Sequence, residues 1–201
     1  MMKVVVGLVL VITVGLAAMP NFRITAAQPW STTMRTTYGI LPTLGIGARF
    51  PRSEHLSVLM ELAGTYARAL PGSGETSLWS ASLRTGLELN TGEKIGFYGA
   101  PGLMVTYASE QFPYADSMTH VISRRNYAGA SIGAFLNAGV RLFRVRNWEL
   151  GVESGLDLVS VPTNSPYPGS DYWAGYYQYW IDASTLNLGL VFRQSRPAGE
   201  K

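Results

Sequence analysis

Apolar and polar residues alternate along several stretches between Tyr38 and Phe192. A period of two predicts a β-strand whose two faces meet different surroundings. The clearest stretch has apolar positions at Leu56, Val58, Met60, Leu62, Gly64 and Tyr66, separated by small or polar residues that include Ser57, Glu61, Ala63 and Thr65. The same period predicts strands at about residues 36–50, 54–69, 76–90, 94–109, 127–144, 147–161 and 178–193.

The composition of the two faces indicates which one meets lipid. A soluble β-barrel would also alternate, because its strands have a core face and a water face. Here the polar face is rich in Gly, Ala, Ser and Thr, and charged residues make up only 14% of the chain. Small residues with a few charges suit the lumen of a narrow barrel, and aliphatic residues ending in Tyr or Trp suit a lipid belt. The sequence therefore predicts an all-β protein, an antiparallel up-and-down transmembrane β-barrel.

The N-terminus carries an apolar run at residues 4–19 that follows Lys3 and predicts a secretory signal peptide. The run is shorter than the roughly 20 residues that a spanning helix needs. Cleavage after Ala27 would place small or polar residues at the recognition positions, while Gly15 and Ala17 offer an earlier site. The expected organisation is a signal peptide at 1–27, an outer-membrane barrel at 28–193 and a polar tail at 194–201.

The connections between the predicted strands alternate in length. Those at 51–53, 91–93 and 145–146 are tight, whereas 70–75, 110–126 and 162–177 are longer. Outer-membrane barrels have short periplasmic turns and longer external loops, so strand 36–50 runs toward the periplasm. Single-chain bacterial barrels have an even number of strands. We therefore expect about eight strands, with the first before residue 36, in 21–27 or 28–35, and no helix after the signal peptide.

Charged and amide side chains gather at inward-facing positions of the predicted strands. In a confined and partly dry lumen an unpaired charge is costly, so we expect interlocked ion pairs that form a structural plug. The alternatives are a narrow polar path for ions or small solutes, and acid/base catalysis by the carboxylates. The residues of this lumen charge network are Arg49, Glu61, Arg84, Glu88, Asn137, Arg141, Glu153 and Asp157.

The long segment 162–177 is crowded with aromatic residues, and two interpretations are open. Tyr and Trp favour the membrane–water interface, which would make them part of an aromatic girdle. Tyr-rich loops also supply contact area at low entropic cost, which suits a binding surface for an external protein or glycan. The candidate residues are Tyr167, Tyr172, Trp173, Tyr176 and Tyr177.

The residues that usually bind metals or perform nucleophilic chemistry are scarce. The chain has no Cys and only two His residues, His55 and His120, so we expect no metal, no cofactor and no catalytic site. His120 lies close to Asp116 and Ser117, but the spacing matches no hydrolase motif, and we expect no enzyme activity. The basic residues are scattered, and removal of 1–27 would lower the net charge of +3 by two units, which excludes a nucleic-acid partner.

Segments such as Gly45–Phe50, Glu61–Tyr66 and Gly139–Phe143 resemble the small outer-membrane β-barrel superfamily, with its OmpA-like and opacity-type domains. The resemblance implies a bacterial outer-membrane location with outer-membrane lipid as a partner. Thr185–Phe192 resembles the terminal strand that the barrel-assembly machinery reads, although Asn187 departs from that signal.

The resulting functional hypothesis is a non-enzymatic outer-membrane barrel with a structural or surface-interaction role through its external loops. A narrow channel through the charged lumen is the alternative, and a lipid-modifying enzyme is the third candidate.

Overall fold

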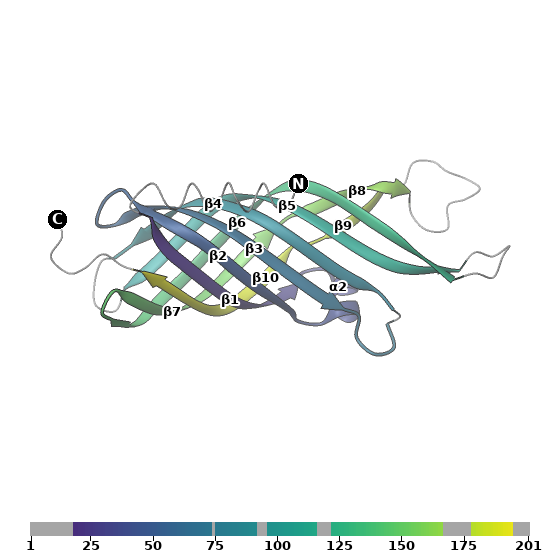
Figure 1. The fold of residues 1–201 in the computed structure, drawn as a ribbon, viewed down its shortest axis with the longest axis horizontal. Helices are drawn as coiled ribbons and strands as arrows, with labels where there is room; N and C mark the ends of the chain where they lie inside the picture. Colours follow the sequence, from purple (N-terminus) through teal and green to yellow (C-terminus); the bar gives the residue numbers. More distant parts are fainter. Residues whose placement is uncertain (1–17, 74, 92–95, 116–121, 167–177, 195–201) are drawn as a thin grey trace.

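Eight strands form a closed antiparallel barrel in the order β1-β10-β7-β6-β5-β4-β3-β2 (Figure 1). The computed structural model describes residues 18–73, 75–91, 96–115, 122–166 and 178–194. The barrel strands are β1 (Met19–Pro29), β2 (Leu41–Pro51), β3 (Leu56–Arg68), β4 (Ser77–Asn90), β5 (Phe97–Ala115), β6 (Ile122–Val145), β7 (Trp148–Leu158) and β10 (Thr185–Gln194). Helix α2 (Thr32–Tyr38) and a sheet of β8 (Ser160–Pro166) and β9 (Gln178–Asp182) are not part of the wall. The predicted fold class is therefore confirmed.

No helix in the described part of the chain is long and apolar enough to cross a membrane. The outer face of the wall carries the apolar residues of each strand instead, and Leu44 and Ile132 are 62% and 74% exposed. From Trp79 to Leu89 this apolar face of β4 runs about 33 Å along the strand. At the usual tilt of roughly 40° this corresponds to about 25 Å along the membrane normal, the height of the apolar band in outer-membrane barrels.

Aromatic pairs flank this belt at both ends. The rings of Trp79 and Tyr107 lie 5.0 Å apart at the end that carries the long connections. Phe22 and Trp148 stack at 6.3 Å at the end with the tight turns. Such girdles mark the two interfaces of a membrane. The apolar face of each strand therefore meets lipid, as the sequence predicts.

Strand β1 is the strand that the sequence pattern leaves unplaced. Arg23 and Thr25 are buried, whereas Phe22 and Ile24 are 40% and 56% exposed, so β1 alternates like the other strands. It closes the barrel by pairing with β10 on one side and β2 on the other. The boundary expected between residues 27 and 28 falls inside this strand.

The expected strand at 36–50 begins only at Leu41, because residues 32–38 form helix α2. Met34 and Tyr38 lie one helical turn apart and are both buried. Gly39 ends the helix with a positive φ of 66°, a conformation that glycine adopts without strain. The expectation of no helix was wrong because two turns are too few to show a helical period.

The expected strands at 147–161 and 178–193 are each divided in two. β7 ends at Leu158 and β10 begins at Thr185, and the chain between them contains the β8–β9 hairpin. This hairpin packs against β6 (Figure 1). A Cβ atom at Gly129 of β6 would collide with the carbonyl oxygen of Pro162. A glycine at this position is thus what lets β8 cross β6 at close range.

The expected loop at 110–126 is mostly strand. β5 continues to Ala115 and β6 begins at Ile122, with pairing along the whole hairpin. The strands therefore extend well beyond the aromatic girdle at this end of the barrel.

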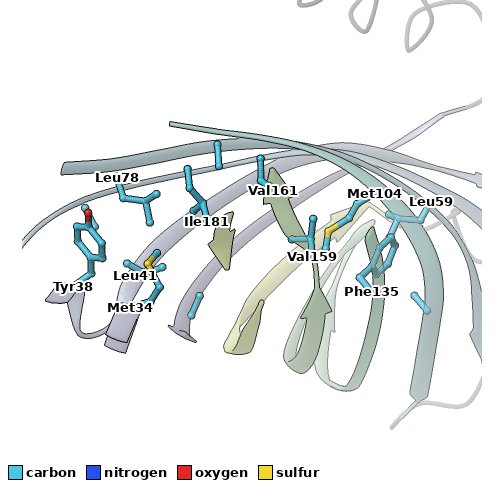
Figure 2. Close-up of a cluster of buried hydrophobic side chains, with 14 residues drawn as sticks. Met34, Tyr38, Leu41, Leu59, Leu78, Met104, Phe135, Val159, Val161 and Ile181 are labelled. Carbon is cyan, nitrogen blue, oxygen red and sulfur yellow. The ribbon is translucent and has the colours of Figure 1, made fainter. Parts of the chain in front are cut away.

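The outer half of the lumen, on the side of the long connections, is filled by apolar side chains, some of which Figure 2 shows in close-up. Helix α2 and the β8–β9 hairpin supply part of this cluster, and the barrel wall supplies the rest. Val161 and Ile181 are completely buried, at 0% exposure. We call this cluster the outer plug; it consists of Met34, Leu41, Leu78, Val159, Val161 and Ile181.

Candidate functional site

The inner half of the lumen contains arginines and carboxylates that pair in strict alternation. Arg84 contacts Asp157 and Glu61. Arg23 contacts Glu61 and lies 2.7 Å from a carboxylate oxygen of Glu153. Arg193 follows, with N–O distances of 3.1 Å to Glu153 and 3.0 Å to Glu88. Arg49 lies 2.8 Å from the other carboxylate oxygen of Glu88. We call this series the ion chain; its order is Asp157, Arg84, Glu61, Arg23, Glu153, Arg193, Glu88 and Arg49.

Strand register explains how the members of the ion chain meet. Glu61 of β3 and Arg84 of β4 are direct cross-strand partners on the inner face. Gly47 of β2 lies opposite Glu61, and a Cβ atom there would collide with the β3 backbone. Glu88 is 0% exposed and Arg84 is 3% exposed. Burial of charges at this depth is tolerated only because each has an opposite partner.

Two aromatic rings support the arginines from inside the lumen. The Tyr98 ring lies 3.6 Å from the guanidinium carbon of Arg193, and the Phe135 ring lies 5.1 Å from that of Arg84. These are cation–π distances. Each ring occupies space left by a glycine, because a Cβ atom at Gly139 or at Gly102 would overlap it. The inward glycines thus make room for rings that hold the arginines in place.

Most residues proposed for the lumen charge network lie in the ion chain, but two do not. Arg141 pairs with Glu149 at 3.2 Å instead. Asn137 is 1% exposed, and its amide makes no hydrogen bond within the described residues. The proposed residues that the ion chain brings together are Arg49, Glu61, Arg84, Glu88, Glu153 and Asp157.

Sequence reasoning missed Arg23, Arg193 and Glu149. Arg23 falls in the segment assigned to the signal peptide, and Arg193 is the last residue of the expected strand 178–193, so neither was counted among the lumen residues. The signal that could have identified such residues is their position on the inward face of an alternating pattern. Arg23, for example, lies between the outward-facing residues Phe22 and Ile24.

We propose that the signal peptide is removed upstream of β1, at the site formed by Gly15 and Ala17. Cleavage after Ala27 would remove Arg23 and leave the carboxylates of Glu61 and Glu153 without this partner. It would also remove the strand that joins β2 to β10. We expect the intact mass of the protein from outer membranes to correspond to a chain that starts at Ala18. A heat-modifiable mature chain that starts at Gln28 would contradict this.

A second buried polar group lies at the outer end of the barrel. Glu110 of β5 is 2% exposed. It accepts hydrogen bonds from the hydroxyl of Tyr38 at 2.5 Å and from that of Tyr179 at 2.6 Å. Burial, together with the adjacent carboxylate, raises the pKa of the Tyr38 phenol well above its ordinary value, so Tyr38 stays protonated as a donor. These three residues, the tyrosine latch, connect α2, β5 and β9.

A small cavity of about 40 Å³ separates the outer plug from the ion chain. Its lining includes Met34 and Val159 on one side and Arg84 and Asp157 on the other. A space of this size holds a few water molecules at most. Side chains therefore fill the lumen on both sides of the cavity.

The remaining candidate residues are not part of either site. Tyr167, Tyr172, Trp173, Tyr176, Tyr177 and His120 lie outside the described residues. His55 lies in the turn between β2 and β3, with its Nδ1 atom 3.0 Å from the carbonyl oxygen of Asn90. No group of three or more His, Cys, Asp or Glu residues that could hold a metal occurs in the part of the chain that the structure describes.

No family model matches the sequence, and no curated protein is similar to it. Among solved structures, Neisserial surface protein A is similar with a TM-score of 0.52 and 14% identity over 89% of this chain and 96% of that chain. Ail, the attachment invasion locus protein of Yersinia pestis, has a TM-score of 0.46 and 11% identity over 88% of this chain and 96% of that chain. The chain has the fold of Neisserial surface protein A, and its apolar outer belt is that of a small eight-stranded transmembrane β-barrel, as the sequence predicts.

Proposed function

We propose that this protein is a non-enzymatic outer-membrane barrel that acts at the cell surface through its external hairpins, by binding an external protein or glycan. The observation that carries the proposal is the projection of the β5–β6 hairpin. Beyond Tyr107 in the outer girdle, β5 continues to Ala115, about 26 Å of strand. Its pairing with β6 reaches the end of both strands, where Ala115 lies opposite Ile122 (Figure 1).

The projecting hairpin is braced by the rest of the outer end. An isolated two-stranded hairpin is only marginally stable in water. Here the rings of Phe112, Tyr127 and Tyr179 pack edge to face with centroid distances of 5.2–5.7 Å. The tyrosine latch adds hydrogen bonds from α2 and β9 to the base of the hairpin. A firm platform of this kind supports recognition, because little conformational freedom is lost on binding.

The filled lumen argues against the channel hypothesis. The ion chain pairs its charges with one another, and the outer plug closes the other half with apolar side chains. An ion would have to displace both. Lipid-modifying chemistry has no support in the described residues, since the hydrogen bond of the His55 ring there is with the carbonyl oxygen of Asn90, at the end of β4.

The proposal includes insertion by the barrel-assembly machinery through Thr185–Phe192. β10 extends to Gln194, and Leu186, Leu188 and Phe192 of this strand are exposed on the outer face. This is the arrangement that a terminal recognition strand needs, because its apolar residues are available before the wall closes.

Shortening the β5–β6 hairpin tests the surface role. Glu110 and Tyr127 are cross-strand partners, so an Asn-Gly turn can replace residues 111–126 and keep the register. We expect cells that display the shortened protein to lose at least about tenfold in retention on immobilised heparin or immobilised serum proteins, as for the loss of a central contact. The measurement is the number of cells retained after washing, relative to cells without the protein.

A matched control shortens a less prominent connection at the same end. The backbone N–H of Ala69 donates to the carbonyl of Thr76 at 2.9 Å, so an Asn-Gly turn can replace residues 70–75. Heat-modifiable mobility establishes that both variants are folded. Equal retention of the full-length and the hairpin-shortened protein on both coatings would contradict the proposal.

A further inference from the structure

A polar groove runs along the outer wall of the barrel, between the β3–β4 connection and the β5–β6 hairpin. Its volume is about 420 Å³. The residues of the ion chain and of the tyrosine latch are not among its lining residues. The side chains that the argument uses are Tyr66, Arg68, Glu75 and Arg124.

The groove lies at the height where lipid headgroups meet the protein. Tyr66 is the cross-strand partner of Trp79 and is 55% exposed on the lipid-facing side, in the outer aromatic girdle. Arg68 is two residues further along the same face, about 7 Å beyond the girdle. Aromatic girdles lie at the headgroup level, so the groove opens at the polar edge of the outer leaflet.

The guanidinium of Arg68 is available for a ligand. Its Nε atom donates to the hydroxyl of Tyr66 at 3.1 Å, which orients the side chain. Its other N–H groups have no partner within the described residues. Tyr66 thereby holds a cation at the edge of the lipid belt with most of its donors free.

Arg124 of β6 supplies the second cation of the groove. It contacts Glu75 at 3.0 Å, and the two side chains are 65% and 82% exposed. An ion pair this exposed is weak and exchanges easily for another anion. With two arginines and one glutamate, the groove retains a net positive charge.

We propose that this groove binds the phosphate of an outer-leaflet lipid headgroup, with Arg68 and Arg124 as donors. Planar guanidinium groups donate two parallel hydrogen bonds to a phosphate, which a single ammonium cannot match. The groove opens directly above the apolar belt, where Trp79 and Leu83 face lipid. A ligand with a phosphate head and acyl chains fits both surfaces, whereas a soluble phosphate fits only the groove.

Titration with defined lipids tests the proposal on the full-length protein in phosphatidylcholine nanodiscs. The probes are bisphosphorylated lipid A, its dephosphorylated form and inorganic phosphate. We expect the variant R68Q/R124Q to bind bisphosphorylated lipid A at least about tenfold more weakly than the unchanged protein, because charge-assisted hydrogen bonds are lost. Native mass spectrometry of the bound and free protein measures the affinity.

The matched control R35Q/R52Q removes the same charge from two exposed arginines outside the groove. We expect it to bind bisphosphorylated lipid A like the unchanged protein. Equal binding by both double variants would overturn the proposal, as would equal binding of the dephosphorylated lipid, since the apolar belt alone would then explain the affinity. Inorganic phosphate that binds as tightly as the lipid would overturn the assignment to a lipid headgroup.

Discussion

Replacing Arg84 with alanine is expected to lower the free energy of unfolding by about 3–5 kcal/mol, because it leaves a buried carboxylate without its cation. Arg84 is 3% exposed and contacts both Asp157 and Glu61. Glu61 keeps Arg23 as a partner. Among the described residues, Asp157 keeps hydrogen bonds from Asn187 and from the Thr185 hydroxyl but no cation, so most of the cost arises at Asp157.

Urea unfolding in detergent micelles measures this loss as a shift of the midpoint. Arg52→Ala and Arg124→Ala are the controls, since both side chains are exposed and each should cost less than about 1 kcal/mol. The double variant R84A/D157N should recover part of the loss, because the unpaired charge is removed with its partner. A midpoint for R84A equal to that of R52A would show that the ion chain does not stabilise the barrel.

The wall of the barrel is predictable because lipid and lumen impose different residues on alternate positions. β3 and β4 occupy residues 56–68 and 77–90, close to the expected 54–69 and 76–90. Both strands lie wholly in the wall, so each side chain faces either lipid or lumen. The resulting contrast is visible without any knowledge of the neighbouring strands.

The alternating pattern does not reveal elements that lie outside the wall, or a strand that directly follows the apolar N-terminal run. β1 begins directly after an apolar run, and its inward residues are easily assigned to the end of a signal peptide. The β8–β9 hairpin separates from β7 and β10 because of space beside Gly129 and Gly133 on another strand. This packing is a tertiary contact with another strand, so the local sequence pattern of residues 147–161 does not reveal it.

The ion chain shows the same limit for the candidate site. The alternating pattern identifies Glu61 and Glu153 as lumen residues, but it does not say which cation each of them contacts. Both contact Arg23 because β1 lies between β2 and β10 in the closed wall. Which charges meet therefore depends on strand order and register around the barrel.

Gly129→Val is expected to expel the β8–β9 hairpin from its place against β6. The new Cβ atom would overlap the carbonyl oxygen of Pro162, and a backbone oxygen moves only if the strand that carries it moves. Release of the hairpin would uncover Val161 and Ile181, which are both 0% exposed. Loss of about 3 kcal/mol of local packing raises the population of the open hairpin by about 100-fold.

Limited proteolysis of the protein in nanodiscs measures this opening, because cleavage inside β8 (Ser160–Pro166) or β9 (Gln178–Asp182) requires a released hairpin. The wall should stay closed and heat-modifiable, since β8 and β9 pair only with each other. Ala130→Val is the matched control, because Ala130 is exposed on the lipid face of the same strand. A cleavage rate of G129V equal to that of A130V would mean that β6 tolerates a side chain at this position and that the glycine does not hold the outer plug in place.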